Sequence, residues 1–154
     1  MSTTEERTQN NELVEQAIAL AAGDDAAAAA YLRTIAGASR TLDDLVDGDR
    51  FVSADAVTKV FANLLVTLPQ NPFFLRHREA LTALHLMAMN AWLDANTWEQ
   101  SHHRTRQLYA HVLRDAIGEI LPAVAYLTGG WPRMREVSLQ IRELFIKEVD
   151  HGNV

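Results

Sequence analysis

The residues best suited to chemistry form an acidic run between two arginines. Four carboxylates fall within seven residues in the segment Arg40-Thr41-Leu42-Asp43-Asp44-Leu45-Val46-Asp47-Gly48-Asp49-Arg50. In a helix, Asp43 and Asp47 share one face and Asp44 lies next to it. Like charges this close raise each other's proton affinity unless a cation neutralises them, and hard oxygen ligands suit Mg²⁺ or Mn²⁺. The spacing predicts a divalent-metal site at these three aspartates, with a solvated acidic helix end as the alternative.

A second segment offers further oxygen ligands. The long apolar stretch from Phe73 to Glu99 carries an inward stripe through Leu81, His85, Ala88 and Trp92, which continues to Asn96 and Glu99. We expect Asn96 and Glu99 to approach the aspartates if the two helices pack side by side. The alternative is that the last turn has left the core. Other polar sets compete as ligands: Asn90 with Asp94, and His111 with Asp115 and Glu119.

Basic residues would complete an anion site beside a metal. Arg40, Arg78 and Arg114 are the candidates, because guanidinium groups bind phosphate oxygens in pairs. The alternative is that they are ordinary surface arginines. The sequence has no serine nucleophile motif, no glycine-rich phosphate loop and no His-Glu-x-x-His zinc pair.

The elements that must position these residues are helices. Apolar spacing is helical along almost the whole chain, and no alternating strand pattern occurs. The predicted helices run from Leu13 to Gly23, from an Asp24 or Asp25 cap to Gly48, from a Ser53 cap to Pro69, from Asn71-Pro72 to Glu99, from His103 to Leu127 with a kink near Pro122, and from Pro132 through Phe145. The fourth is apolar nearly all round, which is typical of a buried helix. The prediction is therefore an all-α fold, a compact bundle of five to six helices around a central apolar helix.

Composition limits the classes of protein. A chain of 154 residues fits one domain, predicted over residues 12–150 after a flexible polar tail at residues 1–11. No apolar run reaches membrane-spanning length, so no membrane is expected. The absence of cysteine restricts any metal to oxygen or imidazole ligands and fits a reducing cytoplasm. A net charge of −6 argues against nucleic acid as the main partner.

The segment from Arg40 to Gly48 resembles the first aspartate-rich motif of class I isoprenoid synthases, particularly the squalene and phytoene synthase branch. That family is all-helical. The resemblance implies that Asp43, Asp44 and Asp47 bind Mg²⁺, which holds a substrate diphosphate. It covers only this run. The family's second metal motif has as counterparts here only Asn90 to Asp94 or Asn96 to Glu99, and both depart from the pattern.

The acidic run, with Leu68-Pro69-Gln70-Asn71-Pro72-Phe73 and Leu113-Arg114-Asp115, also looks like small uncharacterised proteins of bacteriophages and prophages. This resemblance implies that the protein acts in the cytoplasm of a bacterial host and that its partner is a host or phage protein. We favour an accessory protein that acts by protein–protein interaction through its acidic surface.

The alternative is a metal-dependent domain that binds or hydrolyses a phosphate or diphosphate compound, so whether the chain is an enzyme stays open. The sequence also leaves open a homo-oligomer, since Met87 and Met89 fit a monomer core and a dimer interface equally well.

Overall fold

The computed structural model describes the backbone of residues 4–48 and 50–151 and the side chains of residues 8–48 and 50–146. Within this part the chain is helical and contains no strand, which confirms the all-α prediction. The α-helices are α1 (Thr4–Ala22), α2 (Ala26–Asp47), α3 (Ala54–Ala62), α4 (Pro72–Glu99), α5 (Arg104–Arg114) and α6 (Ile120–His151). A π-helical turn, Asn63–Thr67, and two 3-10 turns, Leu68–Gln70 and Asp115–Glu119, join some of them.

Side-chain caps begin three of these helices where the sequence predicts them. Asp25 accepts a hydrogen bond from the Ala28 N–H at 2.9 Å, and Ser53 accepts one from the Ala56 N–H at 3.2 Å. Asn71 caps α4, whose first residue is Pro72. Such caps satisfy N–H groups that the first turn leaves free. Gly48 ends α2 with a φ of 66°, so the acidic run stands at the end of a helix, as predicted.

The first helix begins earlier than the sequence indicates. It starts at Thr4, so the predicted start near Leu13 is too late and residues 4–11 are helical. Tertiary contact accounts for part of the difference, because Arg40 of α2 donates a hydrogen bond to Asn11.

The predicted fifth helix is interrupted. It ends at Arg114, and the 3-10 turn Asp115–Glu119 separates it from α6. The predicted kink near Pro122 is confirmed as this 3-10 turn, and Pro122 itself lies in the first turn of α6, where no N–H is required of it.

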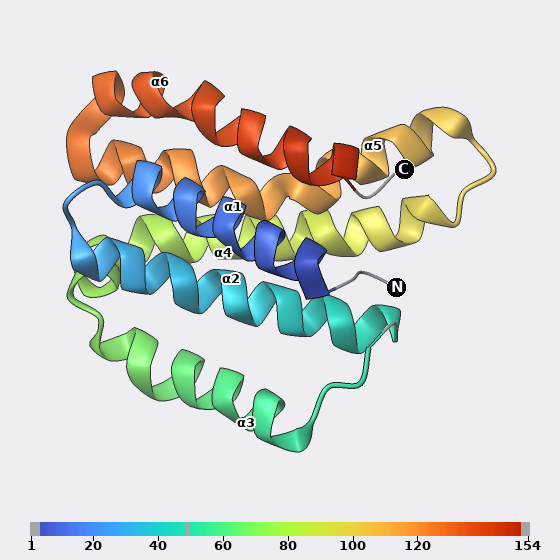
Figure 1. The fold of residues 1–154 in the computed structure, drawn as a ribbon, viewed down its shortest axis with the longest axis horizontal. Coiled ribbons are helices and arrows are strands. Elements are labelled where there is room, and N and C mark those ends of the chain that lie inside the picture. The colour runs from blue at the N-terminus through green and yellow to red at the C-terminus, as the bar shows by residue number, and fades with distance from the viewer. Residues whose placement is uncertain (1–3, 49, 152–154) are drawn as a thin grey trace.

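The chain reverses inside α6 at Gly129-Gly130, directly after the region where the sequence predicts a helix to end at Leu127. Gly130 has φ 75° and ψ −173°, a conformation that residues with a Cβ rarely adopt. Figure 1 shows the two arms of α6 running in opposite directions on either side of this turn. Arg133, just after it, donates to the Leu20 carbonyl of α1 at 2.9 Å, which ties the turn to the end of α1.

The core lies between α1, α2, α4 and α6. Helix α1 packs mainly on α6 and also on α2, while α4 packs on α5 and α2 (Figure 1). The largest fully buried side chains are Tyr31, Phe73, Ile18, Leu81, Ile141, Val124 and Val137. None of the helices in the described part combines the length and apolar character needed to cross a membrane.

Helix α4 is not buried all round, contrary to the prediction. Leu81, Ala88 and Ala95 are buried at intervals of seven residues, so one face of the helix lies against the core. Leu86 and Met87 are 61% and 65% exposed, and Met89 and Leu93 are also exposed. The apolar outer face therefore has no cover within the described chain.

Candidate functional site

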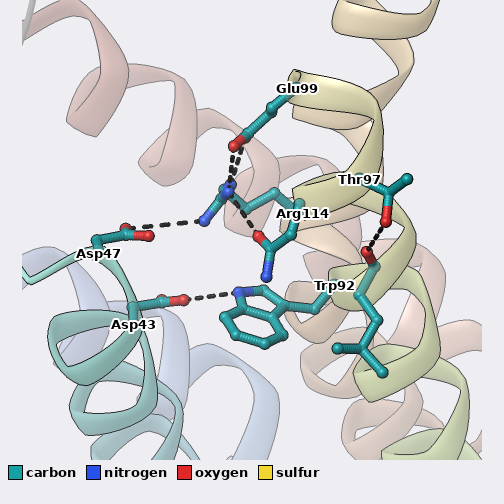
Figure 2. Close-up of polar contacts among 8 residues, drawn as sticks. Asp43, Asp47, Trp92, Thr97, Glu99 and Arg114 are labelled. Carbon is teal, nitrogen blue, oxygen red and sulfur yellow. Dashed lines mark hydrogen bonds and ion pairs between the residues drawn. The ribbon is translucent and has the colours of Figure 1, made fainter. Parts of the chain in front are cut away.

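The predicted site residues of three helices meet at one end of the molecule. Asp43 and Asp47 come from the last turns of α2, Asn96 and Glu99 from the end of α4, and Arg114 is the last residue of α5. Figure 2 shows Asp43 and Asp47 pointing toward Trp92 and Arg114. The α4 pair thus approaches α2 as expected, but the guanidinium of Arg114 stands between the two groups.

Arg114 binds Glu99 as a two-point fork. Its Nε donates to Glu99 Oε1 at 2.7 Å and its Nη2 donates to Glu99 Oε2 at 2.5 Å, while Nη2 also donates to Asn96 Oδ1 at 2.9 Å. Its Nη1 lies 3.9 Å from Asp47 Oδ2. The hydrogen bonds to Glu99 raise the pKa of Arg114 above its usual value. A cation at this position also suits the negative end of the α5 dipole.

Asp43 is held by an indole rather than by an arginine. The Trp92 Nε1–H donates to Asp43 Oδ1 at 2.7 Å. Burial raises the pKa of Asp43, and the hydrogen bond from Trp92 and the charge of Arg114 partly offset this rise. Sequence reasoning used Trp92 only to trace the inward stripe of α4. The signal it missed is that an indole N–H can only donate, so a buried tryptophan needs an acceptor.

Asp44 faces a different neighbourhood. An open hollow of about 500 Å³ is lined by Asn11, Arg40, Asp44, Arg50 and Phe51. Asp44 Oδ1 lies 3.9 Å from Arg50 Nε. The acidic run therefore divides, with Asp43 and Asp47 turned toward α4 and α5 and Asp44 toward the two flanking arginines.

The three arginines predicted to bind an anion do not converge. Arg114 lies with Asp43, Asp47, Trp92, Asn96 and Glu99 where three helices meet, a group we call the α2–α4–α5 cluster. Arg40 instead lines the hollow. Arg78 and Asn96 lie eighteen positions apart on α4, about 27 Å along the helix axis. The prediction grouped the three arginines by their residue type, but the length of α4 keeps Arg78 far from Asn96 and its partner Arg114.

The carboxylates as arranged do not form a metal cage. In the part of the chain that the structure describes, no group of three or more His, Asp or Glu side chains could hold a metal ion. Asp43 Oδ1 accepts from Trp92 and both oxygens of Glu99 accept from Arg114, so these two carboxylates are directed at separate donors. A metal would have to displace Arg114. Asp49, the fourth carboxylate of the run, lies outside the described residues.

An apolar surface that sequence reasoning missed adjoins this cluster. The buried stripe of α2 through Tyr31 and Ile35 continues at helical spacing to Leu42 and Val46, but there it passes beyond the core. Leu42, Leu45 and Val46 are 43%, 49% and 54% exposed, and Phe51 in the following loop is 93% exposed. We call Leu42, Leu45, Val46, Asp47 and Phe51 the α2-end surface.

Comparisons of the chain with protein-family models, curated proteins and solved structures gave no match. The resemblance to the synthase motif and to phage proteins therefore stays an expectation from the sequence.

Proposed function

We propose that this chain is a protein-binding module that docks its partner on the α2-end surface. The observation that carries the proposal is Phe51, a large aromatic side chain that is 93% exposed in the loop after α2, whose last turns also expose Leu45 and Val46. Aromatic anchors set among smaller apolar groups are typical of binding hot spots, and clustered exposed apolar side chains mark interaction sites.

Charge indicates what kind of partner fits. Asp43, Asp47 and Glu99 bring three carboxylates to the cluster, and Arg114 supplies one guanidinium. The remaining negative charge favours a partner that carries lysine or arginine next to an apolar side chain. A host or phage protein with such a segment is the expected class, in keeping with the resemblance to phage proteins.

The cluster also stiffens the surface. Arg114 and Trp92 join the end of α2 to α4 and α5 through hydrogen bonds across 15 to 49 residues of sequence. A surface already fixed in place loses less conformational entropy when a partner binds. Arg114 and Trp92 would then act as positioning residues, and Phe51 and Asp47 as contacts.

Selection from displayed random peptides tests the proposal. The selection uses the wild-type chain, with Phe51→Ser as the test variant and Leu139→Ser as the control, since Leu139 is an exposed leucine on α6. We expect peptides with a basic residue beside an aromatic or aliphatic one, which bind Phe51→Ser at least tenfold more weakly and weaken as salt is raised. Peptides that bind both variants equally and ignore salt would show that this surface is not the docking site.

A metal-dependent function is the second candidate. It is favoured by the convergence of oxygens from Asp43, Asp47, Asn96 and Glu99 around a single cation, Arg114. Its substrate class would be a phosphate or diphosphate compound. Isothermal titration of Mg²⁺ and Mn²⁺ into the wild type and into Asp43→Asn/Asp47→Asn decides it. Saturable binding that the double variant loses would establish the metal site, whereas no heat in the wild type would exclude it.

A further inference from the structure

The outer face of α4 carries an apolar stripe that nothing in the described chain covers. Leu86, Met89 and Leu93 are 61%, 50% and 59% exposed, and they follow one another at steps of three and four residues. That spacing places them in line on one face of a helix and is the spacing of the seam between paired helices. We call these three residues the α4 stripe.

The face around the stripe is almost without charge. From Ala80 to Trp98 the only charged residue is Asp94, and its carboxylate accepts a hydrogen bond from Asn90 at 3.2 Å. His85, in the same stretch, turns inward to Tyr31, with 2.7 Å between Nε2 and the hydroxyl. A helix face in water normally carries charged and polar groups. This one carries a single carboxylate, that of Asp94.

Helix α5 adds further exposed apolar side chains next to α4. It packs along α4 as a hairpin, with the rings of Trp98 and Tyr109 edge to face at 6.2 Å between centroids. Leu108, Tyr109 and Val112 are 56%, 58% and 68% exposed. The two helices together leave large apolar groups in water over much of their length.

The total surface of the chain leaves room for an interface. Its accessible area is 10,201 Å² for a mass of 17.2 kDa, whereas a compact monomer of that mass exposes about 7,800 Å². A stable interface covers about 800 Å² on each partner. The excess is about three times that area, so one interface of ordinary size would still leave the protomer with more surface than a compact monomer.

We propose that the α4 stripe is the contact between two copies of this chain. A two-fold dimer places the same patch on both sides, and a neutral apolar patch meets its own copy without repulsion. A membrane surface fits less well, since helices that lie on membranes carry lysine and arginine along the rim of the apolar face. The proposal does not depend on the α2-end surface, but a dimer would present that surface twice and bind a repeated partner more tightly than one copy does.

The oligomeric state in solution tests the dimer. Sedimentation equilibrium should give about 34 kDa for the wild type, twice the 17.2 kDa of one chain. The variant Leu86→Glu/Leu93→Glu places charges on the stripe, and we expect its dissociation constant to rise at least a hundredfold. The control is Leu139→Glu on α6, where the leucine is 63% exposed, and it should remain dimeric. Circular dichroism checks that both variants keep their helix content.

A covalent test uses the absence of cysteine in the chain. Met89→Cys should form an intermolecular disulfide rapidly under mild oxidation, because Met89 lies at the middle of the stripe, while Leu139→Cys should not. A wild type that stays monomeric at high concentration would overturn the proposal. So would a dimer that survives Leu86→Glu/Leu93→Glu, or equal crosslinking at the two positions.

Discussion

Replacing Arg114 by methionine should lower the free energy of unfolding far more than the same change at Arg142. Each of the two arginines forms a bidentate ion pair with one glutamate. Arg142 donates to Glu119 at 2.5 Å and 3.0 Å, and Arg114 donates to Glu99 at 2.7 Å and 2.5 Å. They differ in burial, because the exposed fractions of the two side chains are 51% and 48% in the Arg142–Glu119 pair but 25% and 31% in the Arg114–Glu99 pair. Methionine keeps most of the apolar stem, so the comparison isolates the charge and its hydrogen bonds.

The magnitude follows from that difference. Exposed ion pairs contribute about 0 to 1 kcal/mol, so Arg142→Met should change stability by less than about 1 kcal/mol. Hydrogen bonds to charged groups contribute about 1.5 to 3 kcal/mol where water is largely excluded, and breaking a fully buried pair costs about 3 to 5 kcal/mol. Arg114 is a quarter exposed and so lies below the buried limit. Its loss also leaves Asp43, Asp47 and Glu99 without their shared cation, and we expect a cost of about 2 kcal/mol.

Urea unfolding followed by circular dichroism measures both variants. With a slope of about 2 kcal/mol per molar urea, Arg114→Met should lower the midpoint by about 1 M and Arg142→Met by less than half as much. Adding Glu99→Gln to Arg114→Met should recover part of the loss, because one unpaired charge is then removed. Equal midpoint shifts for the two arginine variants, or no shift for Arg114→Met, would refute the view that the cluster joins α2, α4 and α5.

Three further predictions concern His85, Trp92 and Gly130. Burial lowers the pKa of His85, so below about pH 6.5 the unfolded state takes up the proton first and stability should fall with decreasing pH, by at most about 1.4 kcal/mol per pH unit, the limit for a single proton; urea midpoints measured across that range should show a slope that His85→Gln reduces. Trp92→Phe removes the donor to Asp43, so the pKa of Asp43 should rise further in an NMR titration of its carboxyl carbon, and stability should fall by about 1 to 2 kcal/mol; an unchanged pKa would contradict the role given to the indole. Gly130→Ala should cost about 1 to 3 kcal/mol because φ there is 75°, whereas Gly37→Ala, inside α2 with open space around it, should stabilise by about 0.5 to 1 kcal/mol; melting curves compare the two.

The sequence by itself determined where several helices begin and end. Asp25, Ser53 and Asn71 cap helices that start at the next residue, and Gly48 ends α2. These features depend on hydrogen bonds within three or four residues and on the backbone freedom of one glycine, so the local sequence contains all the information they need. Periodicity also placed Asn96 and Glu99 on the inward stripe of α4, from which they would approach the acidic end of α2 if the two helices packed side by side.

Only the tertiary structure decided how those groups pair. Asp43 and Trp92 are 49 residues apart in sequence, and Glu99 and Arg114 are 15 residues apart across the α4–α5 hairpin. No periodicity specifies which donor reaches which acceptor over such separations, so a cluster that the sequence predicts as a metal site has an arginine as its cation. The sequence predicts burial for Leu86 and Leu93, and their exposure in the structure has the same cause. An apolar residue type indicates that burial is favourable, but only the arrangement of neighbouring helices determines whether anything is there to bury it.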